Sequence, residues 1–92
     1  MEPIIISIED SLDLHPFRPE EIPDLLDNYL KLAEEKGFPM VRLIHGKGSG
    51  QLREKVHSCL RKNARVSHFR LADPAAGGWG ASFVYLKGRQ EG

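Results

Sequence analysis

Residues 42–53, RLIHGKGSGQLR, place His45, Lys47 and Arg53 around a glycine-rich turn. An apolar run precedes the turn, and a helix-like segment follows it. The free N–H groups of such a turn and of a helix N-terminus favour an anion, and the Lys and Arg side chains add positive charge. The stretch therefore predicts a phosphate cradle, with a plain tight turn as the alternative. It is not a Walker A loop, which needs four residues between its first Gly and Gly-Lys-Ser/Thr.

A second group capable of chemistry lies in residues 11–15, SLDLH. The residues alternate between apolar and polar, which predicts a strand with its leucines facing a core. Asp13 and His15 then lie on the opposite, open face. A His beside a carboxylate is suited to general acid–base catalysis. A single His at a strand end is more often structural, so a catalytic role for His15 depends on which other residues lie nearby.

The remaining periodicity defines the elements that position these groups. Strands are predicted at 11–15, 39–44, 66–71 and 81–86, and helices from about residues 20–23 to Gly37 and over 50–62. The order β-α-β-α-β-β, with two crossovers, predicts that the first three strands are parallel and the last antiparallel. The expected fold is an α/β two-layer sandwich in which a mixed four-stranded sheet carries two helices on one face.

Parallel strands end at the same edge of a sheet, where ligands of open α/β sheets bind. That edge should bring together His15, His45, Lys47, Arg53 and the N–H groups of residues 46–50. Alternation in 66–71 also predicts that His68 and Arg70 share the open face, and that Ser67, Phe69 and Leu71 share the other.

Composition allows one packed domain. We expect residues 1–9 to form an extended arm, 10–87 the domain and 88–92 a disordered tail. Cys59 is the only cysteine, which excludes an internal disulfide, and it has no His or Cys at zinc-ligand spacing. The N-terminus has neither a basic leader nor a membrane-length apolar run, so we expect a cytoplasmic protein without a membrane partner.

Charge is divided unevenly along the chain, although the formal net charge is zero. Residues 41–70 carry eight Lys and Arg against one Glu, and the remainder carries five against twelve acids. A basic half is typical of a polyanion-binding face, although a solvated helix face gives the same pattern.

Three segments together resemble the Smr (small MutS-related) domain: LDLH at 12–15, HGKGSGQLR at 45–53 and GGWGASFVYL at 77–86. The usual first motif continues with Gly, where this chain has Pro16. The resemblance covers roughly residues 10–87 and implies DNA nicking or endonucleolytic cleavage of RNA. It implies catalytic roles for Asp13, His15, His45, Lys47 and Arg53. Residues expected to bind phosphate or nucleic acid are Gly46, Gly48, Ser49, Gly50, Arg42, Lys55, Arg70, Gly78, Trp79 and Gly80, and Trp79 suits either base stacking or packing.

These observations favour an endonuclease acting on DNA or RNA. On RNA, a His would take the 2′-OH proton, another group would protonate the leaving oxygen, and Lys47 and Arg53 would stabilise the charged phosphorane without a metal. Cleavage of DNA would need an activated water, with Mg²⁺ or Mn²⁺ as the expected cofactor; no residue is assigned to metal binding. The alternatives are a non-catalytic nucleic-acid-binding module and, more weakly, a phosphorylated-ligand site or protein adaptor. We expect a monomer or weak dimer.

Overall fold

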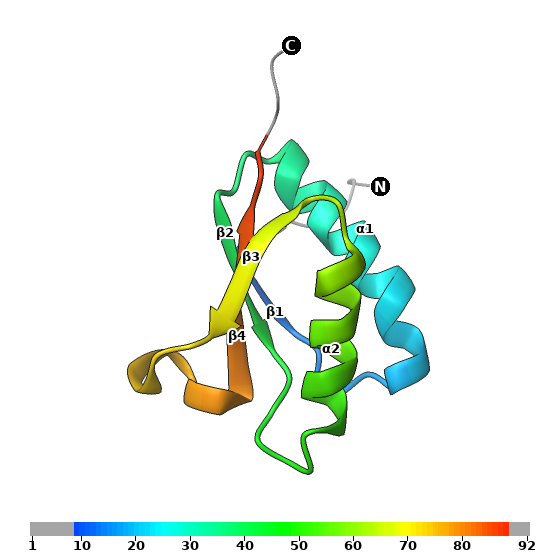
Figure 1. The fold of residues 1–92 in the computed structure, drawn as a ribbon, viewed down its shortest axis with the longest axis vertical. Helices are drawn as coiled ribbons and strands as arrows, with labels where there is room; N and C mark the ends of the chain where they lie inside the picture. Colours follow the sequence, from blue (N-terminus) through cyan, green and yellow to red (C-terminus); the bar gives the residue numbers. More distant parts are fainter. Residues whose placement is uncertain (1–8, 89–92) are drawn as a thin grey trace, which may run out of the picture.

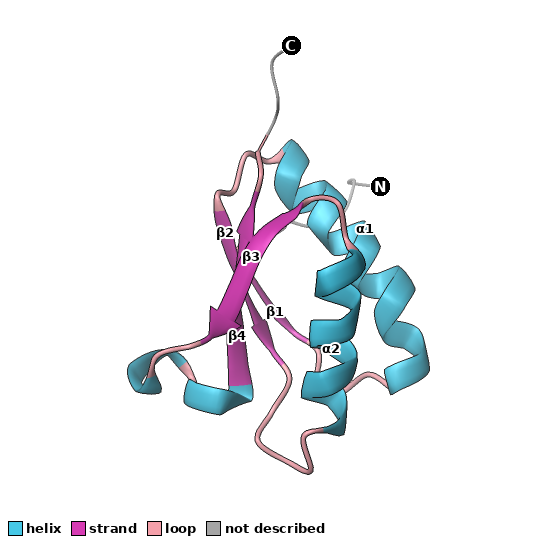
Figure 2. Cartoon of the chain, viewed as in Figure 1, coloured by secondary structure: helices cyan, strands magenta, loops and turns pink. Residues whose placement is uncertain are grey.

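The computed structural model describes residues 9–88. It contains strands β1 (Ser11–Asp13), β2 (Met40–Ile44), β3 (Val66–Leu71) and β4 (Ala81–Leu86), and helices α1 (Ile22–Glu35) and α2 (Gln51–Lys62). The strands form one sheet, and both helices pack on the same face of it (Figures 1 and 2). The predicted two-layer α/β architecture is thus confirmed. Nearly all of the expected extended arm over 1–9 and of the expected tail over 88–92 lies outside the described residues.

The strands lie in the order β1-β2-β4-β3. β1 is parallel to β2, whereas β4 is antiparallel to both β2 and β3. The first three strands therefore run in one direction and β4 in the other, as predicted. The antiparallel β4 separates β2 from β3, so the second crossover skips one place in the sheet.

α1 ends where the sequence predicts. Gly37, with φ +79°, occupies the left-handed position after the helix. The N–H of Gly37 donates to Glu34, and that of Phe38 donates to Ala33. These two bonds form a Schellman motif, which satisfies carbonyls left free at the helix end.

Three segments differ from the sequence prediction. β1 ends at Asp13 rather than at residue 15. The connection over 72–80, where the sequence predicts neither helix nor strand, contains 3₁₀ turns at Pro74–Ala76 and Gly78–Gly80. In β3, the pairing with β4 shifts between Val66 and His68. This β-bulge turns both Val66 and Phe69 toward the helices and leaves Ser67 exposed, so Ser67 does not share the face of Phe69 as strict alternation requires.

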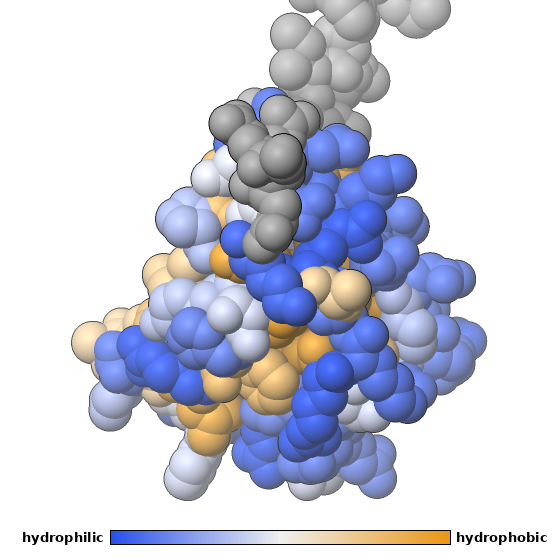
Figure 3. All heavy atoms as spheres, turned by 45° about the horizontal axis from the view of Figure 1, so that its top comes forward, coloured by the Kyte–Doolittle hydropathy of each residue, from blue (hydrophilic) through white to orange (hydrophobic). Residues whose placement is uncertain are grey.

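The core lies between the sheet and the helices. Buried side chains from the strands meet the apolar stripes of both helices; these residues are Leu14, Val41, Leu43, Val84, Leu26, Leu30, Ala33, Val56 and Leu60. The outer surfaces of the helices are mainly hydrophilic (Figure 3). Within residues 9–88, no helix has the length and apolar character needed to span a membrane.

The buried face of α1 should dominate its contribution to stability. Leu30 is 0% exposed, whereas Leu32, two residues on, is 49% exposed. We expect Leu30→Ala to lower the free energy of unfolding by about 2–5 kcal/mol because it removes packed methyl groups and leaves a cavity. Leu32→Ala, the matched control, should change it by less than about 0.5 kcal/mol. Urea denaturation followed by circular dichroism measures both, and equal losses would contradict the assignment of the core.

Candidate functional site

Backbone hydrogen bonds join the three chemistry-bearing segments at one edge of the sheet. The Leu14 N–H donates to the Ile44 carbonyl over 2.7 Å, which holds the end of β1 beside the end of β2. The N–H groups of His45 and Gly46 both donate to the Gly80 carbonyl over 2.9 Å. Residues 12–15 and 45–50 therefore meet, as the parallel topology predicts, and residues 77–80 join them through the Gly80 carbonyl.

His15 and Asp13 form an exposed hydrogen-bonded pair at this edge. The Nδ1 atom of His15 lies 2.6 Å from Oδ1 of Asp13, and the His15 backbone N–H donates to the same oxygen over 3.0 Å. Partial desolvation raises the pKa of Asp13, but the hydrogen bonds from His15 outweigh it and hold the pKa below its ordinary value. An ionised carboxylate only accepts, so Nδ1 of His15 carries a proton, and Nε2 makes no hydrogen bond within the described residues. The imidazole is 62% exposed.

Pro16 is compatible with this geometry. The turn after β1 is closed by the Phe17 N–H, which donates to the Leu14 carbonyl over 3.0 Å, so no N–H is needed from residue 16. Every residue with positive φ in the described part of the chain is a glycine, and Pro16 adopts no such conformation. The glycine usual in this motif is therefore not required for the turn seen in this chain.

An open hollow of about 250 Å³ lies beside the pair. It is lined by His15, Phe17, Pro19, His45, Gly46, Gly48, Ser49, Gly50, Gln51, Leu52 and Arg53. Among the described residues, the N–H groups of Gly48, Ser49 and Gly50, which line the hollow, donate to no other backbone group. α2 begins at Gln51, whose N–H donates to Oγ of Ser49 over 3.4 Å, so the first turn adds the N–H groups of residues 52 and 53 to the same site. The hollow therefore presents N–H donors and a helix N-terminus to a bound anion.

Arg53 adds a full positive charge to the wall of the hollow. Gly50 adopts φ +87°, and a Cβ there would lie 2.9 Å from Nη2 of Arg53. The guanidinium thus lies against the glycine turn, and its Nε is 4.0 Å from the Glu54 carboxylate. Gly50 therefore permits both the positive φ of the turn and the close approach of the Arg53 side chain.

Lys47 lies on the other side of the same turn. A Cβ on Gly80 would lie 2.9 Å from Cγ of Lys47, so the lysine side chain lies across Gly80. Lys47 does not line the hollow, contrary to the expected single cluster. Its neighbour in space is the turn Gly78–Gly80, in which Trp79 is 62% exposed.

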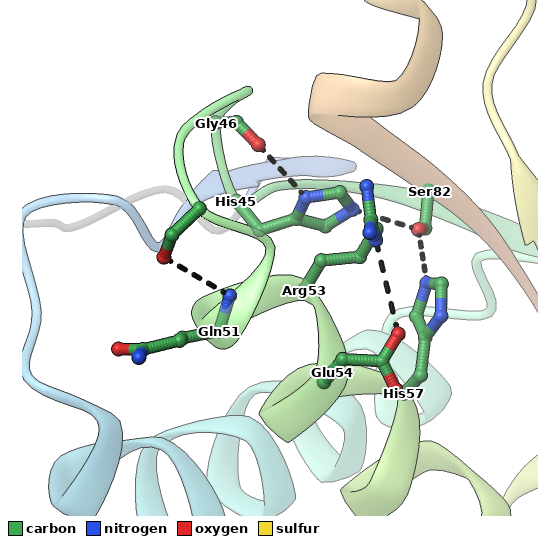
Figure 4. A network of polar contacts seen from close by, with 8 residues as sticks. His45, Gly46, Gln51, Arg53, Glu54, His57 and Ser82 are labelled. Carbon is green, nitrogen blue, oxygen red and sulfur yellow. Dashed lines mark hydrogen bonds and ion pairs between the residues drawn. The ribbon is translucent and has the colours of Figure 1, made fainter.

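His45 differs from His15 because it is buried, with 4% of the residue exposed. Its Nε2 lies 2.9 Å from Oγ of Ser82, and Nε2 of His57 lies 2.7 Å from the same oxygen (Figure 4). Nδ1 of His45 is 3.3 Å from the Gly46 carbonyl. Burial is the main cause that lowers the pKa of both His45 and His57, and nearby positive charges contribute.

His57 and Ser82 were not predicted as site residues. Two signals in the sequence point to them. His57 lies four residues after Arg53, on the same side of the helix, and alternation along β4 places Ser82 on the inner face with Val84. A Ser on a buried face needs a hydrogen-bond partner, and the two imidazoles provide it.

Three of the basic residues expected to bind nucleic acid lie away from the hollow. Arg42 and Arg70 flank Phe83 on the open face of the sheet, with Arg42 bonded to Ser11 and Ala76, and Arg70 bonded to Asp73 and Tyr85. Lys55 lines a separate groove between the helices, near Pro23 and Cys59. Within residues 9–88, no three His, Cys, Asp or Glu side chains are grouped to hold a metal ion.

The buried histidines predict acid sensitivity of the fold. Both have folded-state pKa values below the ordinary 6.5, so the unfolded chain binds more protons as the pH falls below about 6.5. The free energy of unfolding should therefore decrease from pH 6.5 toward pH 5, whereas the contribution of Asp13 is lost only below its ordinary 3.8. Urea midpoints measured every half pH unit test this. His57→Gln should flatten the decrease, and stability that stays constant between pH 7.5 and 5 would contradict it.

Comparisons with known proteins place this arrangement in a family. The family model described as the Smr domain matches residues 12–87. The Endonuclease MutS2 of Thermomicrobium roseum is 42% identical over 80 residues, and that of Lactiplantibacillus plantarum is 39% identical over 80 residues. Each alignment covers 87% of this chain and 10% of the relative, so the chain spans about a tenth of the length of these proteins.

Solved structures show the same fold. The Smr domain of Thermus thermophilus MutS2 superposes with a TM-score of 0.80 at 36% identity, covering 84% of this chain and 96% of that one. YdaL, a stand-alone small MutS-related protein from Escherichia coli, gives a TM-score of 0.72 at 30% identity, covering 84% and 63%. The motifs, the sheet order and these matches lead to one conclusion: the chain belongs to the Smr domain family.

Proposed function

We propose that this Smr domain binds nucleic acid at the edge formed by residues 12–15, 45–53 and 77–80, and cleaves a phosphodiester bond there. The observation that carries the proposal is the Asp13–His15 pair at the rim of the hollow. A proton-accepting nitrogen thus lies beside a site built for an anion. The MutS2 relatives are named as endonucleases, which supports the same chemistry.

RNA is the substrate that these groups fit best. Nε2 of His15 accepts the 2′-OH proton, the 2′ oxygen attacks phosphorus, and the bond to the 5′ oxygen breaks. The products are a 2′,3′-cyclic phosphate and a 5′-hydroxyl, the leaving oxygen taking a proton from water. Arg53 and the free N–H groups of the glycine turn stabilise the charge that develops on the phosphorane.

The surface beyond the turn suits the neighbouring nucleotide. Lys47 lies across Gly80 and is placed to contact a second phosphate, and the exposed Trp79 offers a face on which a base can stack. Arg42 and Arg70 would contact backbone that continues over the open face of the sheet. Cleavage of DNA at the same site would draw on Mg²⁺ or Mn²⁺, for which Asp13 is the carboxylate available at this edge.

A non-catalytic nucleic-acid-binding module is the second candidate. The burial of His45 favours it, because both ring nitrogens are engaged within the protein and only His15 is exposed at the site. The resemblance implies catalytic roles for both His15 and His45, but the geometry leaves only His15 exposed at this edge.

Replacing His15 separates the two candidates. We expect His15→Ala to reduce cleavage of labelled single-stranded RNA by about 10²–10⁴-fold, because the general base is lost, while RNA affinity stays nearly unchanged. Asp13→Asn should reduce cleavage and leave the fold intact. His68→Ala, on the open face, is the control. Reactions with EDTA and with Mg²⁺ or Mn²⁺, on RNA and on supercoiled DNA, identify the substrate and metal dependence.

Three outcomes would count against the assignment. Unchanged cleavage by His15→Ala excludes it as the base. Salt-sensitive binding without cleavage by the wild type identifies the non-catalytic module. Nicking of DNA that requires a divalent metal replaces the 2′-OH mechanism.

Arg53 should contribute to binding rather than only to chemistry. Because one phosphate contact releases about one counterion, Arg53→Gln should weaken RNA binding and reduce the slope of log K against log[salt] by about 1. Arg61→Gln, at the far end of α2, is the matched control. Fluorescence anisotropy from 50 to 300 mM salt, about the range in which such contacts are screened, measures both slopes. Equal slopes would remove Arg53 from the phosphate site.

A further inference from the structure

A chain of four polar groups runs from α2 to the glycine turn. It passes from Nε2 of His57 to Oγ of Ser82 (2.7 Å), from Oγ to Nε2 of His45 (2.9 Å), and from Nδ1 of His45 to the Gly46 carbonyl (3.3 Å). Figure 4 shows the serine between the two imidazoles. Ser82 is fully buried, and His57 also packs against the ring of Phe69, 4.9 Å away between centroids.

The chemistry of the end group fixes where every proton lies. A carbonyl oxygen can only accept, so Nδ1 of His45 carries a hydrogen. A neutral imidazole has one N–H, so Nε2 of His45 must accept, and the Ser82 hydroxyl donates to it. That hydroxyl then has only lone pairs left for His57, whose Nε2 must be the donor. Burial keeps both rings neutral near pH 7, which agrees with this arrangement.

We propose that His57 is a positioning residue: through Ser82 it holds His45 as the Nδ1–H tautomer and thereby fixes the Gly46 carbonyl and the shape of the glycine turn. The consequence for the turn follows from peptide geometry. In a trans peptide the C=O and the next N–H point in opposite directions, so a Gly46 carbonyl held toward His45 turns the Lys47 N–H away from it.

This series of hydrogen bonds gives the two histidines at the site different roles. Both nitrogens of His45 are committed within the protein, whereas Nε2 of His15 is free. His45 therefore supports the turn, and His15 alone supplies the proton-accepting nitrogen. This functional consequence rests on the proposed nuclease function, but the tautomer and the turn geometry do not.

Nitrogen-15 NMR of the imidazole rings tests the proposal directly in the wild-type protein. Two-bond ¹H–¹⁵N spectra distinguish a protonated Nδ1 from a protonated Nε2. We expect His45 to be a single Nδ1–H tautomer and His57 a single Nε2–H tautomer near pH 7. The opposite tautomer for His45, or a rapidly exchanging mixture, would overturn the proposal without any mutant.

Two substitutions at position 57 test its effect on the turn. His57→Phe keeps a ring against Phe69 but removes the donor, whereas His57→Gln retains an amide donor of similar reach. In His57→Phe we expect mixed His45 tautomers and shifted backbone amide signals over 46–50. RNA cleavage should fall by about tenfold, a loss typical of removing an orienting partner. His57→Gln should restore all three toward wild type.

His68→Phe is the matched control, because it also replaces an imidazole by a phenyl ring, at a residue stacked on Tyr85 on the open face. It should leave the His45 tautomer and the amide signals of 46–50 unchanged. Wild-type tautomers and amide signals in His57→Phe would overturn the positioning role. The expected spectra in a protein that does not cleave RNA would support that role and reject the nuclease function.

Discussion

The double hydrogen bond to the Gly80 carbonyl is the constraint on which the site depends. Two successive N–H groups, from His45 and Gly46, donate to one oxygen, so the end of β2 and the start of β4 are held at one point. A Cβ on Gly80 would lie 3.4 Å from the Gly46 carbonyl carbon and 2.9 Å from the Lys47 side chain. This close approach of two backbones needs the glycine, and the positions of Lys47, Trp79 and the turn all follow from it.

Two histidines with similar sequence contexts occupy opposite environments because of the pleat and the layers. The odd positions of β2, Val41 and Leu43, face the helices, and His45 continues the same side inward. The corresponding side of β1 carries Leu12 and Leu14, so Asp13 and His15 face outward. One imidazole is thus enclosed in a buried hydrogen-bond network, and the other is oriented by an exposed carboxylate.

Much of this arrangement could be predicted from the sequence because the signals are local. Periodicity gave both helices and all four strands, with the first strand ending at Asp13 rather than His15. Parallel topology correctly brought His15, His45 and the glycine turn to one edge. The glycine at position 37 correctly marked the end of α1.

The features that could not be predicted depend on contacts between distant residues. The position of β4 between β2 and β3 cannot be predicted from the alternation of apolar and polar residues in these strands. The bulge near Ser67 allows Val66 and Phe69 both to pack inward, which strict alternation forbids. A Lys in a glycine-rich turn is a typical phosphate ligand, but the close approach of Gly80 places the Lys47 side chain on the far side of the turn. The pairing of His57 with Ser82 joins residues 25 apart in the chain.

The central place of β4 also governs how the domain can assemble. β3 and β4 are neighbours along the chain, but β4 pairs with β2 across the whole of α2 and β3, so closing the sheet requires contacts between segments far apart in the sequence. Gly80 and Ser82 belong to the segment that makes this long-range pairing, and without it neither the turn nor the two histidines are held. A chain caught part-way through folding therefore has no formed site, which makes the site a property of the complete sheet rather than of any motif within it.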